Sequence, residues 1–124
     1  MLNAAAEHLR EARSILTIRL WGPAGRAAFM AAPVAARGYI FQATGQVVKT
    51  HRGTHNSFYR TVLGDTRFDA ELRGFLSRAY ALKDVTDYGI GPARDIAEER
   101  ARGAIETAAR FVALMEEILS SPPP

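Results

Sequence analysis

The sequence predicts an all-α protein, an antiparallel up-and-down helical bundle of four long helices plus one short helix. Apolar residues recur at helical spacing along nearly the whole chain. No segment shows the alternation of a strand bounded by hairpin turns. With 124 residues, 48% of them hydrophobic and 23% charged, the chain has the size and composition of one globular domain. We assign residues 1–119 to the bundle and residues 120–124 to a disordered Pro-rich tail.

The first two long helices are expected on either side of a Gly-Pro break. Asn3 is expected to cap the first helix, which should run to about Trp21, where Gly22-Pro23 follows. The second helix should cover about residues 24–44, with a kink at Pro33. Its alanines make it thin and favour a place in the middle of the bundle; they are Ala27, Ala28, Ala31, Ala32, Ala35 and Ala36.

A short third helix is expected after Gly45, which should end the second helix, and after a polar loop over residues 46–53. Thr54 or Asn56 is the expected cap of this helix.

The last two long helices have the most regular apolar patterns. Asp69 is expected to cap the fourth helix, and Pro92 is expected to open the fifth after a break at residues 88–91. The apolar stripe of the fourth helix consists of Leu72, Phe75, Leu76, Ala79 and Leu82. That of the fifth consists of Ala101, Ala104, Ile105, Ala108, Phe111, Val112, Met115, Ile118 and Leu119.

Charge is distributed unevenly along the chain. The net charge is +3, yet residues 26–83 hold nine basic and three acidic side chains, whereas residues 84–124 hold four basic and eight acidic ones. No Asp or Glu occurs in residues 12–64. A surface built from that stretch would have a positive potential and attract phosphates, although a solvated basic face balanced by an acidic last helix is the alternative interpretation.

Several classes of protein are excluded by composition. The absence of Cys removes disulfides, thiolate metal sites and Cys nucleophiles. The longest apolar run, residues 27–36, is about half the length that a membrane-spanning helix needs. We therefore expect no membrane association. The first residues show no apolar signal core, so a cytoplasmic location is expected.

An ordered set of short motifs resembles the HEPN family (higher eukaryotes and prokaryotes nucleotide-binding), in particular its small stand-alone prokaryotic members. Helix 2 of those relatives opens with Arg and aromatic residues, and here Arg26 and Phe29 match. A Lys-Thr-His-x-Gly loop with a Phe after it is matched by residues 49–53 and by Phe58. The Asp-Tyr stretch that ends helix 4 is matched by residues 82–89.

The resemblance implies an antiparallel helical bundle that commonly forms a homodimer. It also implies one of two roles, a metal-independent RNase or a nucleotide- or RNA-binding module, often beside a minimal nucleotidyltransferase partner in a toxin–antitoxin-type pair. Lys83, Asp87 and Tyr88 would be the remnant of the family site, with Tyr88 a target for nucleotide transfer and Arg26 paired with Asp84 or Asp87.

The RNase motif of the active relatives is degenerate in this chain. Those relatives place Arg and, a few residues later, His on one helical face, where they supply a cation and a base. None of the histidines, His8, His51 and His55, has an arginine five to seven positions before it. The nearest match is Lys49 before His55. His51 and His55 are therefore the catalytic candidates if the protein is an enzyme at all.

The leading hypothesis is a binding module without catalysis, which uses the basic middle region. The residues expected to contact phosphate or nucleotide are Arg26, Lys49, His51, Arg52, His55 and Arg60. The alternatives are a metal-independent RNase toxin with a rearranged Lys/His site and a structural dimerisation domain without ligand. No cofactor is expected. A metal site is not expected either, because Gly53 between His51 and His55 argues against a helix there.

Overall fold

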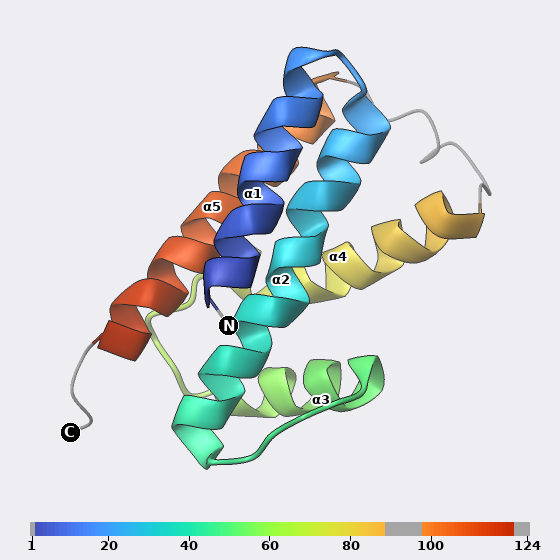
Figure 1. Cartoon of the computed structure of the whole chain (residues 1–124). Helices are drawn as coiled ribbons and strands as arrows, with labels where there is room; N and C mark the ends of the chain where they lie inside the picture. Colours follow the sequence, from blue (N-terminus) through green and yellow to red (C-terminus); the bar gives the residue numbers. More distant parts are fainter. Residues whose placement is uncertain (1, 89–97, 121–124) are drawn as a thin grey trace.

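The protein is all-helical in a computed structural model that describes residues 2–88 and 98–120, and the side chains of 3–79 and 98–120 (Figure 1). Within these ranges there is no strand, so the predicted all-α class is confirmed. The helices are α1 (Leu2–Thr17), α2 (Trp21–Thr44), α3 (His51–Val62), α4 (Ala70–Tyr88) and α5 (Glu98–Ser120). None of the helices in the described part is long and apolar enough to cross a bilayer.

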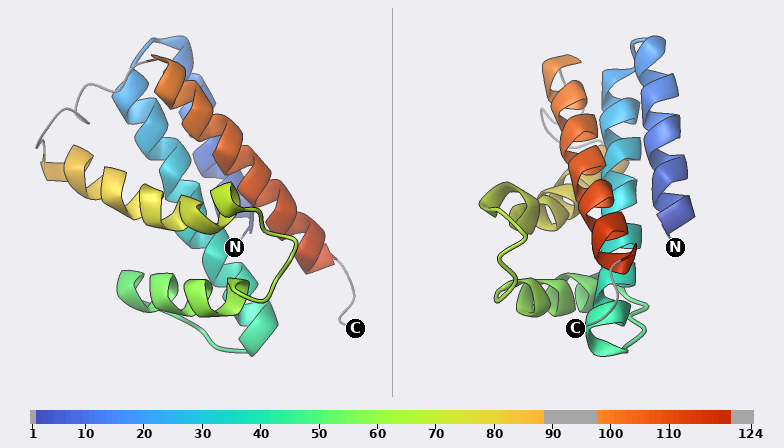
Figure 2. Two further views of the ribbon diagram at one scale, coloured as in Figure 1. Left: turned by 180° about the vertical axis from the view of Figure 1, so that it is seen from behind. Right: turned by 90° about the vertical axis from the view of Figure 1, so that its left-hand side faces the viewer.

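Helix α2 is the axis of the molecule. It contacts each of the other four helices, which confirms that the thin second helix lies in the middle. Helix α1 runs antiparallel to α2 and to α5, and these three lie side by side (Figures 1 and 2). Helix α4 crosses α2 at a steep angle, and α3 lies across the far end of α2 (Figures 1 and 2). The arrangement therefore differs from a regular bundle in which all long helices are nearly parallel or antiparallel.

The central position of α2 depends on its alanines. Small side chains let neighbouring helices approach closely, because the distance between two helix axes is set by the residues at their contact. Pro33 is also buried, and α2 continues through it. The alanines that are buried on α2 are Ala24, Ala27, Ala28, Ala31, Ala32, Ala35 and Ala36.

The large side chains of the core gather where α2, α3, α4 and α5 meet. Phe58 of α3 is 5.8 Å from Phe68 and 5.7 Å from Phe111, measured between ring centroids. Tyr39 of α2 packs edge-on against Phe68 at 5.2 Å, and Phe75 of α4 lies 5.5 Å from Phe111. Offset and edge-to-face ring pairs of this kind stabilise beyond the area that they bury. This cluster fixes α3 to the end of α2, and it fixes α4 farther along α2, where Phe75 lies 5.4 Å from Phe29.

The boundary between α1 and α2 differs from the prediction. Asn3 lies inside α1 and does not cap it, and the helix ends at Thr17, four residues earlier than expected. Arg19 then adopts the left-handed conformation with φ of 63°, which turns the chain back. Helix α2 begins at Trp21, so Pro23 falls in its first turn, where a missing N–H breaks no helical hydrogen bond.

The caps of the other helices confirm two predictions and correct one. Gly45 ends α2 in the left-handed conformation, and Asp69 caps α4 by accepting a hydrogen bond of 2.8 Å from the Leu72 N–H. Helix α3 begins earlier than predicted, because its N-cap is Thr50, whose hydroxyl accepts from the Gly53 N–H at 2.9 Å. The predicted caps, Thr54 and Asn56, both lie inside α3.

The prediction for α5 can be compared with the structure at only one end of the helix. Its expected opening at Pro92 lies outside the described residues, as does the tail from residue 121 onward. Ser120, placed in the tail by the prediction, is the last residue of the helix, and its hydroxyl donates to the Glu116 carbonyl at 2.5 Å.

We predict that Ala32→Leu lowers the free energy of unfolding by about 1–3 kcal/mol, because a larger side chain overpacks the buried contact of α2 with its neighbours. Urea denaturation followed by circular dichroism measures this. The control is Ala43→Leu on the exposed side of the same helix, which should change stability little. An equal effect of the two substitutions would contradict the role assigned to the buried alanines.

Candidate functional site

Helix α3 presents two different faces. Thr54, Ser57, Phe58 and Val62 are buried against the bundle. The opposite face is exposed, and the side chains that share it recur at helical spacing: Arg52, Asn56, Tyr59, Arg60 and Leu63. The exposed face therefore combines two guanidinium groups, one amide, one aromatic ring and the apolar side chain of Leu63 at its end, and we call it the α3 surface.

The buried side of α3 is fixed by polar contacts as well as by Phe58. Arg37 of α2 donates from Nε to the Thr54 hydroxyl at 3.2 Å, and that hydroxyl in turn donates to the Thr50 carbonyl at 2.7 Å. On the side facing α4, His55 Nε2 lies 2.6 Å from the Ser77 hydroxyl. A buried hydroxyl needs such partners, so these contacts stabilise the orientation of α3 on the bundle.

Five of the predicted phosphate-binding residues lie together in one segment. Lys49 is exposed in the loop before α3, and His51, Arg52 and Arg60 are exposed on the helix. His55 is half-buried beside Ser77.

The sixth, Arg26, is elsewhere. It lies near the start of α2, eleven residues before the Arg37 that contacts α3, which is about 16 Å along the helix axis. The sequence grouped Arg26 with the others because charge along a chain does not reveal position in space.

The expected family-site remnant lies on the last two turns of α4. The side chains of Lys83, Asp87 and Tyr88 fall outside the described part of the structure. The expected ion pair of Arg26 with Asp84 or Asp87 falls outside it as well.

The two histidines of α3 are on successive turns of one helix, at positions i and i+4. The expectation that Gly53 prevents a helix here is wrong, because the Thr50 cap places Gly53 in the first turn. Among the described side chains, no group of three or more His, Cys, Asp or Glu residues is arranged to hold a metal ion.

Asp65, which follows α3 in the chain, is held by hydrogen bonds from two residues, and the sequence did not predict them. Asp65 accepts a hydrogen bond of 3.0 Å from the Tyr39 hydroxyl and a bidentate pair from Arg67, at 2.8 Å from Nε and 2.5 Å from Nη2. The hydrogen bonds from Arg67 lower the pKa of Asp65 to about 2. Burial, followed by the neighbouring Asp65, raises the pKa of Tyr39, so the phenol keeps its proton.

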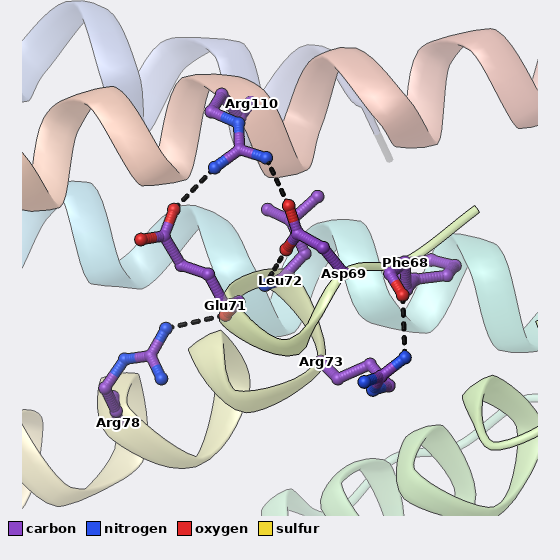
Figure 3. A network of polar contacts seen from close by, with 7 residues as sticks. All are labelled: Phe68, Asp69, Glu71, Leu72, Arg73, Arg78 and Arg110. Carbon is purple, nitrogen blue, oxygen red and sulfur yellow. Dashed lines mark hydrogen bonds and ion pairs between the residues drawn. The ribbon is translucent and has the colours of Figure 1, made fainter. Parts of the chain in front are cut away.

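The acidic residues at the start of α4 are paired in the same way (Figure 3). Arg110 of α5 donates to Asp69 at 2.6 Å and to Glu71 at 2.5 Å. The N–H of Leu72 and then Arg110 lower the pKa of Asp69. Arg73 and Arg78 donate instead to uncharged backbone carbonyls, those of Phe68 and Glu71. The three acids nearest in sequence to α3 thus share two guanidinium groups, and the charges of Arg73 and Arg78 add to the positive side of the balance.

Comparison with protein-family models and with curated protein sequences finds no match for this chain. The resemblance to the HEPN family therefore stays a prediction from the residues that carry it.

Sequence reasoning missed the residues whose roles depend on tertiary contacts. Helical spacing places Tyr59 one turn before Leu63, and both are exposed, Tyr59 over 60% of its surface and next to Arg60 in the chain. The signal that could have singled out Tyr59 is its place in the acid-free window, because aromatic residues interleaved with arginines are typical of nucleic-acid-binding surfaces.

We predict that Asp65→Asn lowers the free energy of unfolding at neutral pH by about 1–2 kcal/mol, because it weakens charged hydrogen bonds on a partly solvated group. The folded pKa lies below the unfolded one, so the carboxylate stabilises the fold above the ordinary pKa of 3.8, and this contribution is lost as the pH falls towards about 2. The stability gap between the two proteins should therefore close over that interval, as measured by denaturation at several pH values.

The control for this prediction is Thr66→Ala at the exposed neighbouring position, which should change neither stability nor its pH dependence. A gap between wild type and Asp65→Asn that stays constant through the acid range would contradict the assignment.

Proposed function

We propose that the protein is a binding module for phosphate-bearing ligands, nucleotide or RNA, and that it contacts them through the α3 surface with Lys49, His51 and His55 at its margin. The observation that carries this proposal is one exposed helix face that bears Arg52 and, about two turns later, Tyr59 and Arg60. That helix lies in a stretch of sequence without acids, residues 12–64.

The chemistry of these side chains supports a phosphate ligand. A guanidinium donates two parallel hydrogen bonds to a phosphate, and arginine keeps its charge at every physiological pH. An exposed tyrosine ring offers a face on which an unpaired base can stack. The nearest acids, Asp65, Asp69 and Glu71, share two guanidinium groups, those of Arg67 and Arg110, which reduces the negative charge that they set against α3.

On this proposal the chain is a HEPN-like module that forms a homodimer and works with a minimal nucleotidyltransferase, as in a toxin–antitoxin-type pair in the cytoplasm. The order of the matched motifs and the all-helical fold support it. A purely structural dimerisation domain is the alternative, and it differs by predicting no salt-sensitive binding.

A second candidate function is a metal-independent RNase with a rearranged Lys/His site. It is favoured by one observation: His51 and His55 lie on successive turns of α3, which is helical from His51 onward. Histidine titrates near neutral pH and can move the proton of a ribose hydroxyl. Lys49 would supply the cation that stabilises the negatively charged transition state.

We predict that the protein binds a short single-stranded RNA with an affinity that falls steeply with salt. Replacing Arg52 and Arg60 by Gln should weaken binding and lower the slope of log K against log salt by about 0.7 for each phosphate that the variant no longer neutralises. Tyr59→Ala should weaken binding by about 1–3 kcal/mol with little change of slope, because stacking is uncharged. Fluorescence anisotropy with labelled RNA measures both quantities.

The control is Arg102→Gln on the exposed side of α5, which removes one positive charge from another part of the surface. If Arg102→Gln weakens binding as much as either α3 arginine does, the ligand contacts general surface charge and the α3 surface is not the site.

The RNase candidate predicts cleavage of RNA in the presence of EDTA. His51→Ala with His55→Ala should then abolish cleavage while leaving the fold intact, as judged by circular dichroism. Intact RNA after prolonged incubation with wild-type protein would rule this candidate out and leave binding alone.

A further inference from the structure

Ser77 of α4 carries a hydroxyl beside an imidazole, and the function proposed above does not use this serine. Its Oγ lies 2.6 Å from Nε2 of His55 on α3, a distance at which a proton can pass between the two groups. Ser77 is exposed and His55 is half-buried, so a small molecule can reach the hydroxyl from solvent. A serine within hydrogen-bond distance of a base is the arrangement that activates this otherwise weak nucleophile.

The direction of this hydrogen bond follows from the state of the imidazole. In a neutral ring with its proton on Nδ1, Nε2 accepts the hydrogen bond that the Ser77 hydroxyl donates. In that state His55 can take the hydroxyl proton while the oxygen forms a new bond. The pair therefore has the geometry of a nucleophile with its general base.

The guanidinium of Arg78 lies one turn from Ser77 on the same helix. It folds back along α4, where Nη2 donates to the Glu71 carbonyl at 2.6 Å (Figure 3). A Cβ on Gly74 would lie 2.7 Å from Nη1 of Arg78, so the guanidinium lies directly over this glycine. Gly74 and Ser77 are three residues apart and are therefore neighbours on the helix surface.

The positive charge beside Ser77 is available to an anion. Arg78 and Arg73, the latter one turn before Ser77, both donate to backbone carbonyls. Neither pairs with a carboxylate among the side chains that the structure describes. A guanidinium carries five N–H donors, so Arg78 can bind phosphate oxygens while it keeps its bond to the backbone.

We propose that Ser77 is an acyl-acceptor site and that its substrate is an acyl phosphate. Arg78 binds the phosphate over Gly74. Because Gly74 precedes Ser77 by about 4.5 Å along the helix axis, the carbonyl carbon attached to that phosphate falls at the Ser77 hydroxyl, and the phosphorus atom lies farther away. The cation thus selects the leaving group, and His55 activates the nucleophile.

The transfer is complete with these groups and the acyl phosphate. Oγ of Ser77 forms a bond to the carbonyl carbon, and the bond from that carbon to the bridging oxygen breaks. The phosphate leaves with the electron pair of that bond. Nε2 of His55 takes the hydroxyl proton and then releases it to water, which restores the neutral ring. The products are an acyl ester of Ser77 and inorganic phosphate.

The test uses the full chain with acetyl phosphate, and mass spectrometry of its peptides follows acetylation of each serine with time. Ser14, exposed on α1, is the control within the same molecule. We expect Ser77 to react about a hundredfold faster than Ser14, since a positioned general base contributes a factor of about 10²–10⁴. His55→Gln, which takes up no proton, should lower the Ser77 rate to that of Ser14 while circular dichroism shows an intact fold.

A second probe tests the part assigned to Arg78. Phenyl acetate carries the same acetyl group without a phosphate. Arg78→Gln should slow the reaction of Ser77 with acetyl phosphate about tenfold, the effect of losing about 1.4 kcal/mol, and should leave the reaction with phenyl acetate unchanged. Arg13→Gln, at an exposed position of α1, is the matched control and should change neither rate.

Three results would overturn the proposal. One is acetylation of Ser77 at the rate of Ser14 or at a rate that His55→Gln does not lower. Another is a rate with acetyl phosphate that Arg78→Gln leaves unchanged. The third is a phosphoryl group on Ser77 in place of the acetyl group. RNA binding is tested on variants of Arg52 and Arg60, which keep Ser77 and His55, so failure of this proposal and failure of the proposed function are separate results.

Discussion

The alanine face of α2 is the constraint on which the rest of the structure depends. Interiors of proteins are packed as densely as organic crystals, so the separation of helices follows from the side chains between them. Because the buried positions of α2 are mostly alanine, α1 and α5 pack closely along it. Most of the buried rings gather towards one end, where Tyr39, Phe58 and Phe111 meet. The molecule is thus narrow where α1 and α5 run along α2, and it is broad where α3 and α4 cross α2.

This division places different chemistry at the two parts of α2. The broad part carries α3, whose basic side chains face away from the aromatic cluster. The narrow part carries a hollow beside α1, where a glutamate and an arginine line one small space. Acids near the broad part are tied to Arg67 and Arg110, so pairing inside the fold, and not composition alone, decides where positive potential remains.

The features that could be predicted from the sequence are those that depend on residues close together in the chain. Helical periodicity predicted the all-α class, and the caps at Gly45 and Asp69 are where the local pattern placed them. The start of α3 was predicted wrongly because two threonines lie four residues apart and both can cap a helix. Thr50 is the N-cap in the structure, whereas Thr54 is buried inside the helix and accepts a hydrogen bond from Arg37, a residue of another helix.

What the sequence could not predict depends on residues that are distant along the chain. Tyr39 and Asp65 meet across 26 residues, and no local rule couples them. The same is true of Glu11 and Arg26, which are brought to one hollow by the pairing of α1 with α2. Composition predicted that a basic surface exists, but only the fold separates Arg26 from Lys49, Arg52 and Arg60.

The two-sided character of α3 has a consequence for how such a protein can change over time. Phe58 and Val62 anchor the helix from one side, and the side chains that face solvent take no part in that anchoring. Substitutions at the exposed positions of α3 therefore change which ligand or partner the helix contacts without disturbing how it packs on the bundle. Such a helix is an evolvable element, open to a new partner while the scaffold beneath it stays the same.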